Sequence, residues 1–296
     1  MSVNSSLNSS DSSLHAFLND CSESRPSTFI FTAFTIINIL LLPLFIFVLY
    51  VGYQRWRKPR FVSTTVTNHS DVFTYNVVFM EMVSVLGCCL FSSGSLAGIK
   101  SMILVALDMF SITSPGQILF HLLTCVERYL AVVHPITYLG LRQSGGVRIR
   151  NISVACVWLI CFGWFGISKV LVASFNSIAT SCLLVFSIIS VSFCSLSVLC
   201  VLIRPGPGDM GGDRERVDQT KRRGFYNITA IMGALMLRFV GILVSVMMSS
   251  YVQTHTVCMV VFSGLWLTLP SSLVLPLLFL HRAGKLPGCK HSTESG

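Results

Sequence analysis

Two adjacent charges of opposite sign, Glu127 and Arg128, stand near the end of a long apolar run and are followed by Tyr129. A charge at the boundary of a membrane is tolerated when it is paired or can reach water. Glu127 can hold Arg128 in one arrangement, and in another Arg128 can turn toward the exposed carbonyls at the end of a partner's helix. These residue types predict an electrostatic switch between two arrangements of similar energy. The alternative is a boundary anchor, with Tyr129 in an aromatic belt.

Two further charges, Glu81 and Arg238, lie deep inside apolar runs. An isolated charge at the centre of a membrane costs about 2.5–3.5 kcal/mol on insertion scales. We therefore expect Glu81 and Arg238 to form an ion pair between the second and sixth membrane-spanning helices. The alternative is that Arg238 faces another polar partner or a water-filled cavity.

Metal binding and enzymatic catalysis find little support in the sequence. There is no Cys-x-x-Cys or His-Glu-x-x-His spacing, and His121 is the only histidine inside an apolar run. Most of the eleven cysteines also lie in apolar runs, where a free thiol behaves as a small hydrophobic group. We expect no metal, no cofactor and no enzymatic activity.

The elements that carry these residues are expected to be membrane-spanning helices. Hydrophobic residues make up 53% of the chain and charged residues only 11%, against roughly 25% charged in soluble proteins. About 20 helical residues cross the apolar core of a bilayer, and a helix satisfies its own backbone there. The chain is thus predicted to be an all-α membrane protein, a seven-transmembrane helix bundle. The seven stretches are 28–53, 73–94, 102–132, 151–173, 178–203, 225–250 and 257–280.

The orientation follows from the positions of the basic residues. If the N-terminus is outside, seventeen of the 21 lysines and arginines face the cytoplasm and three face outward, so we expect the C-terminus to be cytoplasmic. Glycosylation sequons at Asn4 and Asn8 then lie in an extracellular tail of residues 1–27, before a helical domain of 28–282 and a short cytoplasmic tail of 283–296. The net charge of +9 accordingly indicates that the chain contacts a lipid bilayer surface rather than a nucleic acid. Residues 204–224 are expected to form a flexible inner loop.

The run from Glu127 through Tyr129 to Pro135 resembles the inner end of helix three in rhodopsin-like (class A) G-protein-coupled receptors. In that family an Asp/Glu-Arg-Tyr triplet is followed by an apolar stretch and a proline. Pro276 and Phe279 resemble the family's Asn-Pro-x-x-Tyr motif, with Leu275 in place of the asparagine and Phe279 in place of the tyrosine. Partial matches in helices one, two and four are Asn38, Asn76 with Glu81, and Trp158.

The resemblance implies a divergent, orphan-type G-protein-coupled receptor in the plasma membrane. Such a receptor binds an unknown extracellular ligand and activates a heterotrimeric G protein for signal transduction. Amine receptors carry an aspartate where this chain has Phe110, which argues against a biogenic amine. By position, the ligand pocket is expected to involve Phe110, Ser111, Ser114 and Trp266, and plain helix packing is the alternative for each.

Departures from the family pattern leave other interpretations open. Ile103 replaces the usual helix-three cysteine, so Cys21 and Cys258 could pair instead, or both could be free thiols. Helix six lacks the Cys-Trp-x-Pro run and helix five lacks its proline. In the family, the helix-two acid, here Glu81, lies in a polar pocket that binds sodium. Leu275 removes one polar group from that pocket and Arg238 adds a positive charge, so we expect no sodium site. A receptor-like protein without G-protein signalling is therefore the main alternative, and a channel or transporter has less support because no internal repeat is evident.

Overall fold

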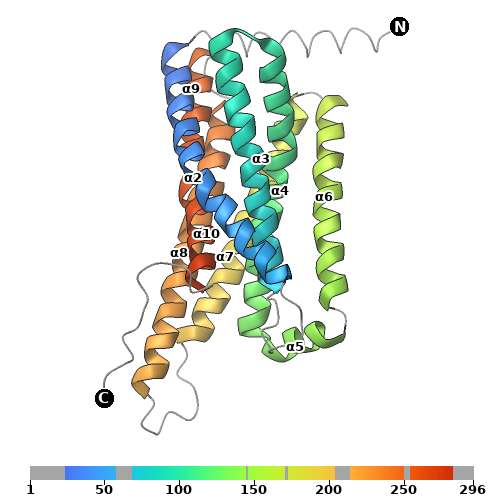
Figure 1. Cartoon of the computed structure of the whole chain (residues 1–296), viewed down its shortest axis with the longest axis vertical. Helices are drawn as coiled ribbons and strands as arrows, with labels where there is room; N and C mark the ends of the chain where they lie inside the picture. The colour runs from blue at the N-terminus through green and yellow to red at the C-terminus, as the bar shows by residue number, and fades with distance from the viewer. Residues whose placement is uncertain are drawn as a thin grey trace.

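The computed structural model describes residues 24–57, 69–144, 146–170, 173–203, 214–249 and 254–282, and within these ranges every regular element is a helix (Figure 1). Seven spans are long and apolar enough to cross a membrane, the seventh being built from two consecutive helices. The predicted all-α seven-helix bundle is thus confirmed. The helices are α2 (Arg25–Arg57), α3 (His69–Ala97), α4 (Lys100–Val133), α5 (Pro135–Ser144), α6 (Gly146–Val170), α7 (Ala173–Ile203), α8 (Arg214–Ser249), α9 (Thr254–Trp266) and α10 (Leu269–Arg282).

Helix α4 occupies the centre of the bundle, where it packs against α3, α6 and α7. Helix α8 packs against α7, α9 and α10, and α2 closes the far side against α3 and α9. Helix α6 lies at the edge of the bundle, and its span is the least buried of the seven. The central position of α4 explains why most of the polar side chains discussed below contact it or one of its neighbours.

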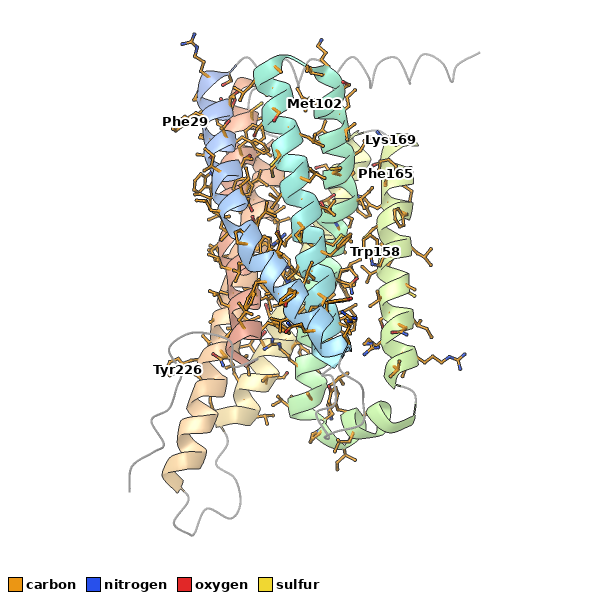
Figure 2. The ribbon with its side chains drawn as sticks, in the orientation of Figure 1. Phe29, Met102, Trp158, Phe165, Lys169 and Tyr226 are labelled. Atoms are coloured by element: carbon orange, nitrogen blue, oxygen red, sulfur yellow. The ribbon has the colours of Figure 1, made fainter. Side chains whose placement is uncertain are left out.

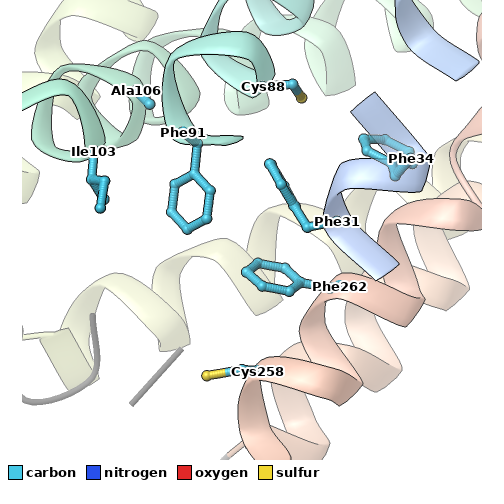
Figure 3. Close-up of a cluster of buried hydrophobic side chains, with 8 residues drawn as sticks. All are labelled: Phe31, Phe34, Cys88, Phe91, Ile103, Ala106, Cys258 and Phe262. Atoms are coloured by element: carbon cyan, nitrogen blue, oxygen red, sulfur yellow. The ribbon is translucent and has the colours of Figure 1, made fainter. Parts of the chain in front are cut away.

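An aromatic cluster holds one end of the bundle together (Figure 3). The ring of Phe31 on α2 lies 4.7 Å from that of Phe91 on α3 and 4.8 Å from that of Phe262 on α9, measured between centroids. Tilted aromatic pairs at this separation are favourable beyond the area that they bury. Cys258 lies in the same cluster and is fully buried.

The connection between the third and fourth spans is helical, and so is part of the connection between the fifth and sixth, contrary to the expectation for 204–224. Helix α8 begins at Arg214, so the prediction of a flexible loop is wrong for 214–224, while 204–213 lies outside the described residues. Residues 214–223 contain no glycine or proline and are rich in Arg, Glu, Lys and Gln, which favour helix even in water. The Pro-Gly repeat that suggested a loop occupies only 205–208.

The seventh span is broken, where the sequence suggested one helix over 257–280. The N–H groups of Leu267 and Thr268 donate to the carbonyls three residues before them, at 3.2 and 3.0 Å, and Thr268 Oγ1 donates to the Leu265 carbonyl at 2.6 Å. Pro270 explains the break, because its ring has no N–H and would collide with the carbonyl four residues earlier in a continuous helix. In the first turn of α10 the missing N–H costs nothing.

Candidate functional site

The switch residues lie at the C-terminal end of α4, as the sequence predicted. Glu127 is buried, and Tyr138 of α5 donates its hydroxyl to Glu127 Oε1 at 3.3 Å. Helix α4 ends at Val133, and Pro135 opens α5 as its first residue, a position suited to proline. Helix α5 thus turns back to contact the switch. Tyr138 was missed because the ten residues of α5 are too few to cross a membrane, so a search for apolar spans does not detect this helix.

Tyr129 forms a second contact between the end of α4 and its surroundings. Its hydroxyl lies 3.3 Å from His134 Nε2, and its ring packs against Phe193 of α7 with centroids 5.8 Å apart. Tyr129 therefore ties the switch to the C-terminal half of α7. The pairing of Glu127 with Arg128 in a resting state stays a prediction.

Arg128 lines a small cavity between three helices at this end of the bundle. The cavity offers about 20 Å³ to a water-sized sphere, which is room for about one water molecule. A larger group could enter only if α7 and α8 moved away from α4. The lining residues are Cys125 and Arg128 from α4, Cys194, Ser195 and Val198 from α7, and Ile228 and Ile231 from α8.

Glu81 and Arg238 form the expected ion pair in the centre of the bundle. Arg238 Nη1 donates to Glu81 Oε1 at 2.9 Å and to Ser271 Oγ at 3.0 Å, and Arg238 Nη2 donates to Gln117 Oε1. All four side chains are at least nine-tenths buried. One guanidinium therefore connects α3, α4, α8 and α10. Its planar fork of donors suits several acceptors at once.

The remaining family-like residues occupy structural positions. Trp158 Nε1 on α6 donates to Asn76 Oδ1 on α3 at 3.2 Å, and Asn38 Nδ2 donates to the backbone carbonyl of Phe34 at 2.9 Å. Pro276 lies within α10. Phe279 is buried, with its ring 5.4 Å from that of Tyr75 in an edge-on contact. The helix-seven motif thus packs against α3 through an aromatic pair.

The four residues expected around a ligand do not line one common surface. Phe110 packs over Gly87 of α3, and Trp266 lies edge-on to Phe34 of α2, so both contact the aromatic cluster of Figure 3. The Ser111 hydroxyl donates to its own helix at the Leu107 carbonyl. Ser114 points outward and is exposed. Position along the chain did not reveal these orientations, and a ligand role for any of the four stays a prediction.

Cys258 is disulfide-bonded. The expected partner, Cys21, lies outside the described residues, as do the sequons at Asn4 and Asn8. The remaining cysteines in the described part of the chain are free. Among those same residues, no group of three or more His, Cys, Asp or Glu side chains comes together as a metal site would require.

An exposed ion pair joins α4 to α6 near the other end of the bundle. Lys169 Nζ lies 2.5 Å from Asp108 Oδ1, and Lys169 also lies 5.3 Å from the centre of the Phe165 ring (Figure 2). Both charged side chains are more than a third exposed. Asp108 is thus engaged laterally rather than aimed at the centre of the bundle.

No family model matches the chain, and no curated protein matches it in a sequence comparison.

Proposed function

We propose that this chain is a plasma-membrane receptor that binds an extracellular ligand and activates a heterotrimeric G protein. One observation carries the proposal: Arg128, next to a buried glutamate at the end of the third of seven helices, lines the cavity between α4, α7 and α8. In this arrangement the cavity has room for about one water molecule. Its position is where a partner's helix could enter if the bundle opened.

Ligand binding acts by favouring one of two arrangements of the bundle. A ligand that binds the open arrangement better shifts the population toward it by its difference in affinity. In the open arrangement α8 lies farther from α4, and Arg128 meets the carbonyl groups at the end of a partner helix, which carry partial negative charge. Tyr138, which donates to Glu127, stabilises the closed arrangement.

The test is G-protein dissociation in cells that express the chain at a verified surface level, across several G-protein subtypes. Arg128→Ala is compared with Arg148→Ala, which removes an exposed arginine at the start of α6. We expect a basal or stimulated signal that falls at least tenfold in Arg128→Ala and is unchanged in Arg148→Ala. A signal that is indifferent to Arg128 contradicts the proposed mechanism.

A receptor-like protein without G-protein signalling is the second candidate, and the ion network favours it. Arg238 bonds α8 to α3, α4 and α10 at once, and α8 contains no proline at which it could bend. Gln117→Leu removes one of these bonds without removing a charge. Silence in every subtype, for both the unaltered chain and Gln117→Leu, supports this second candidate.

A further inference from the structure

Four buried nitrogen atoms near the central ion pair have no hydrogen-bond partner within the part of the chain that the structure describes. They are Gln117 Nε2, Arg238 Nε and both ring nitrogens of His121. His121 is completely buried, and Arg238 and Gln117 are 3% and 6% exposed. The hydrocarbon interior of a bilayer has no group that could satisfy them, and an unpaired buried donor costs about 1–3 kcal/mol. A further polar or charged group between them would satisfy these atoms.

These atoms lie in one region between α4 and α8. Gln117 and His121 are one turn apart on the same face of α4, where side chains four positions apart are neighbours. Gln117 Oε1 accepts from Arg238, which places the amide nitrogen of Gln117 close to the guanidinium. The His121 ring lies edge-on to Phe239, the neighbour of Arg238, with centroids 6.5 Å apart.

The unused atoms are mostly donors. Arg238 Nε offers one N–H, Gln117 Nε2 offers two, and a neutral imidazole offers one donor and one acceptor. The carboxylate of Glu81 is already engaged by Arg238 at 2.9 Å. A water molecule would bring two more donors into this region, whereas a halide only accepts. The positive charge of Arg238 also disfavours a cation.

We propose that a small monovalent anion, chloride under ordinary conditions, binds between Gln117, His121 and Arg238. The charges of Glu81 and Arg238 cancel, so a buried anion needs one more positive charge close by. His121 supplies it by becoming imidazolium when the anion binds, which also turns its second nitrogen into a donor. The anion is therefore bound together with one proton.

Few other ionisable groups can take that proton. Glu81 from α3 and Arg238 from α8 are the charged neighbours. The buried thiols are neutral at the pH values used here, because an ordinary thiol ionises only near pH 8.5; they belong to Cys88 on α3, Cys125 on α4 and Cys161 on α6. Helix α7 carries no Asp, Glu, Lys, Arg or His, and α10 carries none before His281. His121 is thus the group whose protonation follows anion binding.

The experiment measures thermal unfolding of the purified full-length chain in detergent, at equal ionic strength and at pH 6 and pH 7.5. Sodium chloride, choline chloride, sodium bromide and sodium gluconate are compared. We expect the unfolding midpoint to rise by about 2–4 °C with chloride or bromide, whichever cation is present, and to rise more at pH 6. Gluconate is too large for the site and is expected to have no effect.

Two variants and one control locate the effect. Gln117→Leu and His121→Leu should unfold at the same temperature in chloride and gluconate, while Thr113→Val, one turn from Gln117 on α4, should keep the chloride effect. The proposal is overturned if the unfolding midpoint rises with sodium rather than with the halide. It is also overturned if no salt raises the midpoint, which would mean that water alone satisfies these donors. The salt series on the unaltered chain decides this even if a variant does not fold, and none of its outcomes depends on signalling.

Discussion

At the scale of single residues, Arg238 hydrogen-bonds to side chains of three other helices in the bundle interior. Its ion pair with Glu81 could be predicted because each charge alone is too costly within an apolar span. Its contacts with Gln117 and Ser271 could not, because neutral polar residues are common in helices and carry no comparable penalty when they bond to their own backbone. Hydropathy identifies which residues need a partner, but only packing identifies the additional acceptors.

The central ion pair gives a prediction by charge exchange. Glu81→Arg places two positive charges together in the membrane interior and should abolish surface expression. The double variant Glu81→Arg with Arg238→Glu should restore it, because the pair is re-formed and Gln117 and Ser271 can both donate to the carboxylate now on α8. Surface labelling of intact cells measures the outcome. No recovery in the double variant would show that the pairing itself is not what the fold requires.

The exposed pair between Lys169 and Asp108 is the matched control for this experiment. Removing one partner of a buried pair costs about 3–5 kcal/mol, whereas an exposed pair is worth about 0–1 kcal/mol. We therefore expect Asp108→Asn to leave surface expression and the unfolding midpoint nearly unchanged. A loss of surface expression as large as that in Glu81→Arg would mean that the exposed pair anchors α6 to the bundle.

At the scale of helices, the contact between α8 and α9 depends on Gly264. A Cβ atom at this position would collide with the side chain of Ser245 on α8, whose Cβ would lie 2.9 Å away. Gly163 on α6 has nothing within 4 Å of the same position. One glycine thus permits a close helix contact, and the other faces open space.

These two glycines give opposite expectations for the same substitution. Gly264→Ala should destabilise the bundle by about 1–3 kcal/mol through overpacking, and Gly163→Ala should be neutral or stabilise it by up to about 1 kcal/mol through helix propensity. Thermal unfolding in detergent measures both. Ser245→Gly combined with Gly264→Ala should recover part of the loss, and equal midpoints for the two single variants would contradict this account of the packing.

The sequence predicted the seven spans well because length and apolar composition almost determine a membrane helix. It predicted the details of the seventh span poorly, because Pro270 lies inside an apolar run and hydropathy does not register a missing N–H. It also misjudged 214–224, where charge was read as a sign of a loop although the residues favour helix. Backbone chemistry and helix propensity, rather than hydropathy, decide these boundaries.

The candidate site also has one part that the sequence predicts and another that it does not. The position of Arg128 at the end of the third span could be predicted from a contiguous motif. The contact with Tyr138 could not, because it depends on a turn at His134 that brings α5 back to α4. The outward orientation of Ser114 likewise depends on the rotation of α4 about its axis, which is determined by all of its neighbours together.

At the scale of the whole molecule, helix packing does not say which end of the bundle faces the cytoplasm. That assignment depends on the basic residues, of which the sequence predicts seventeen on one side and three on the other. The proposed function requires the same orientation, because Arg128 must face the cytoplasm to meet a G protein. A measurement of orientation therefore tests the proposal without any knowledge of its ligand.

Glycosylation provides that measurement. With the N-terminus outside, Asn4 and Asn8 are accessible to the transferase of the secretory pathway, whereas the sequons at Asn68, Asn151 and Asn227 face the cytoplasm. Glycosidase treatment should increase the gel mobility of the unaltered chain, and Asn4→Gln with Asn8→Gln should remove that shift. The triple variant Asn68→Gln, Asn151→Gln and Asn227→Gln should leave it intact. A shift lost only in the triple variant would mean that the bundle has the opposite orientation and that Arg128 lies outside, where it could not reach a G protein.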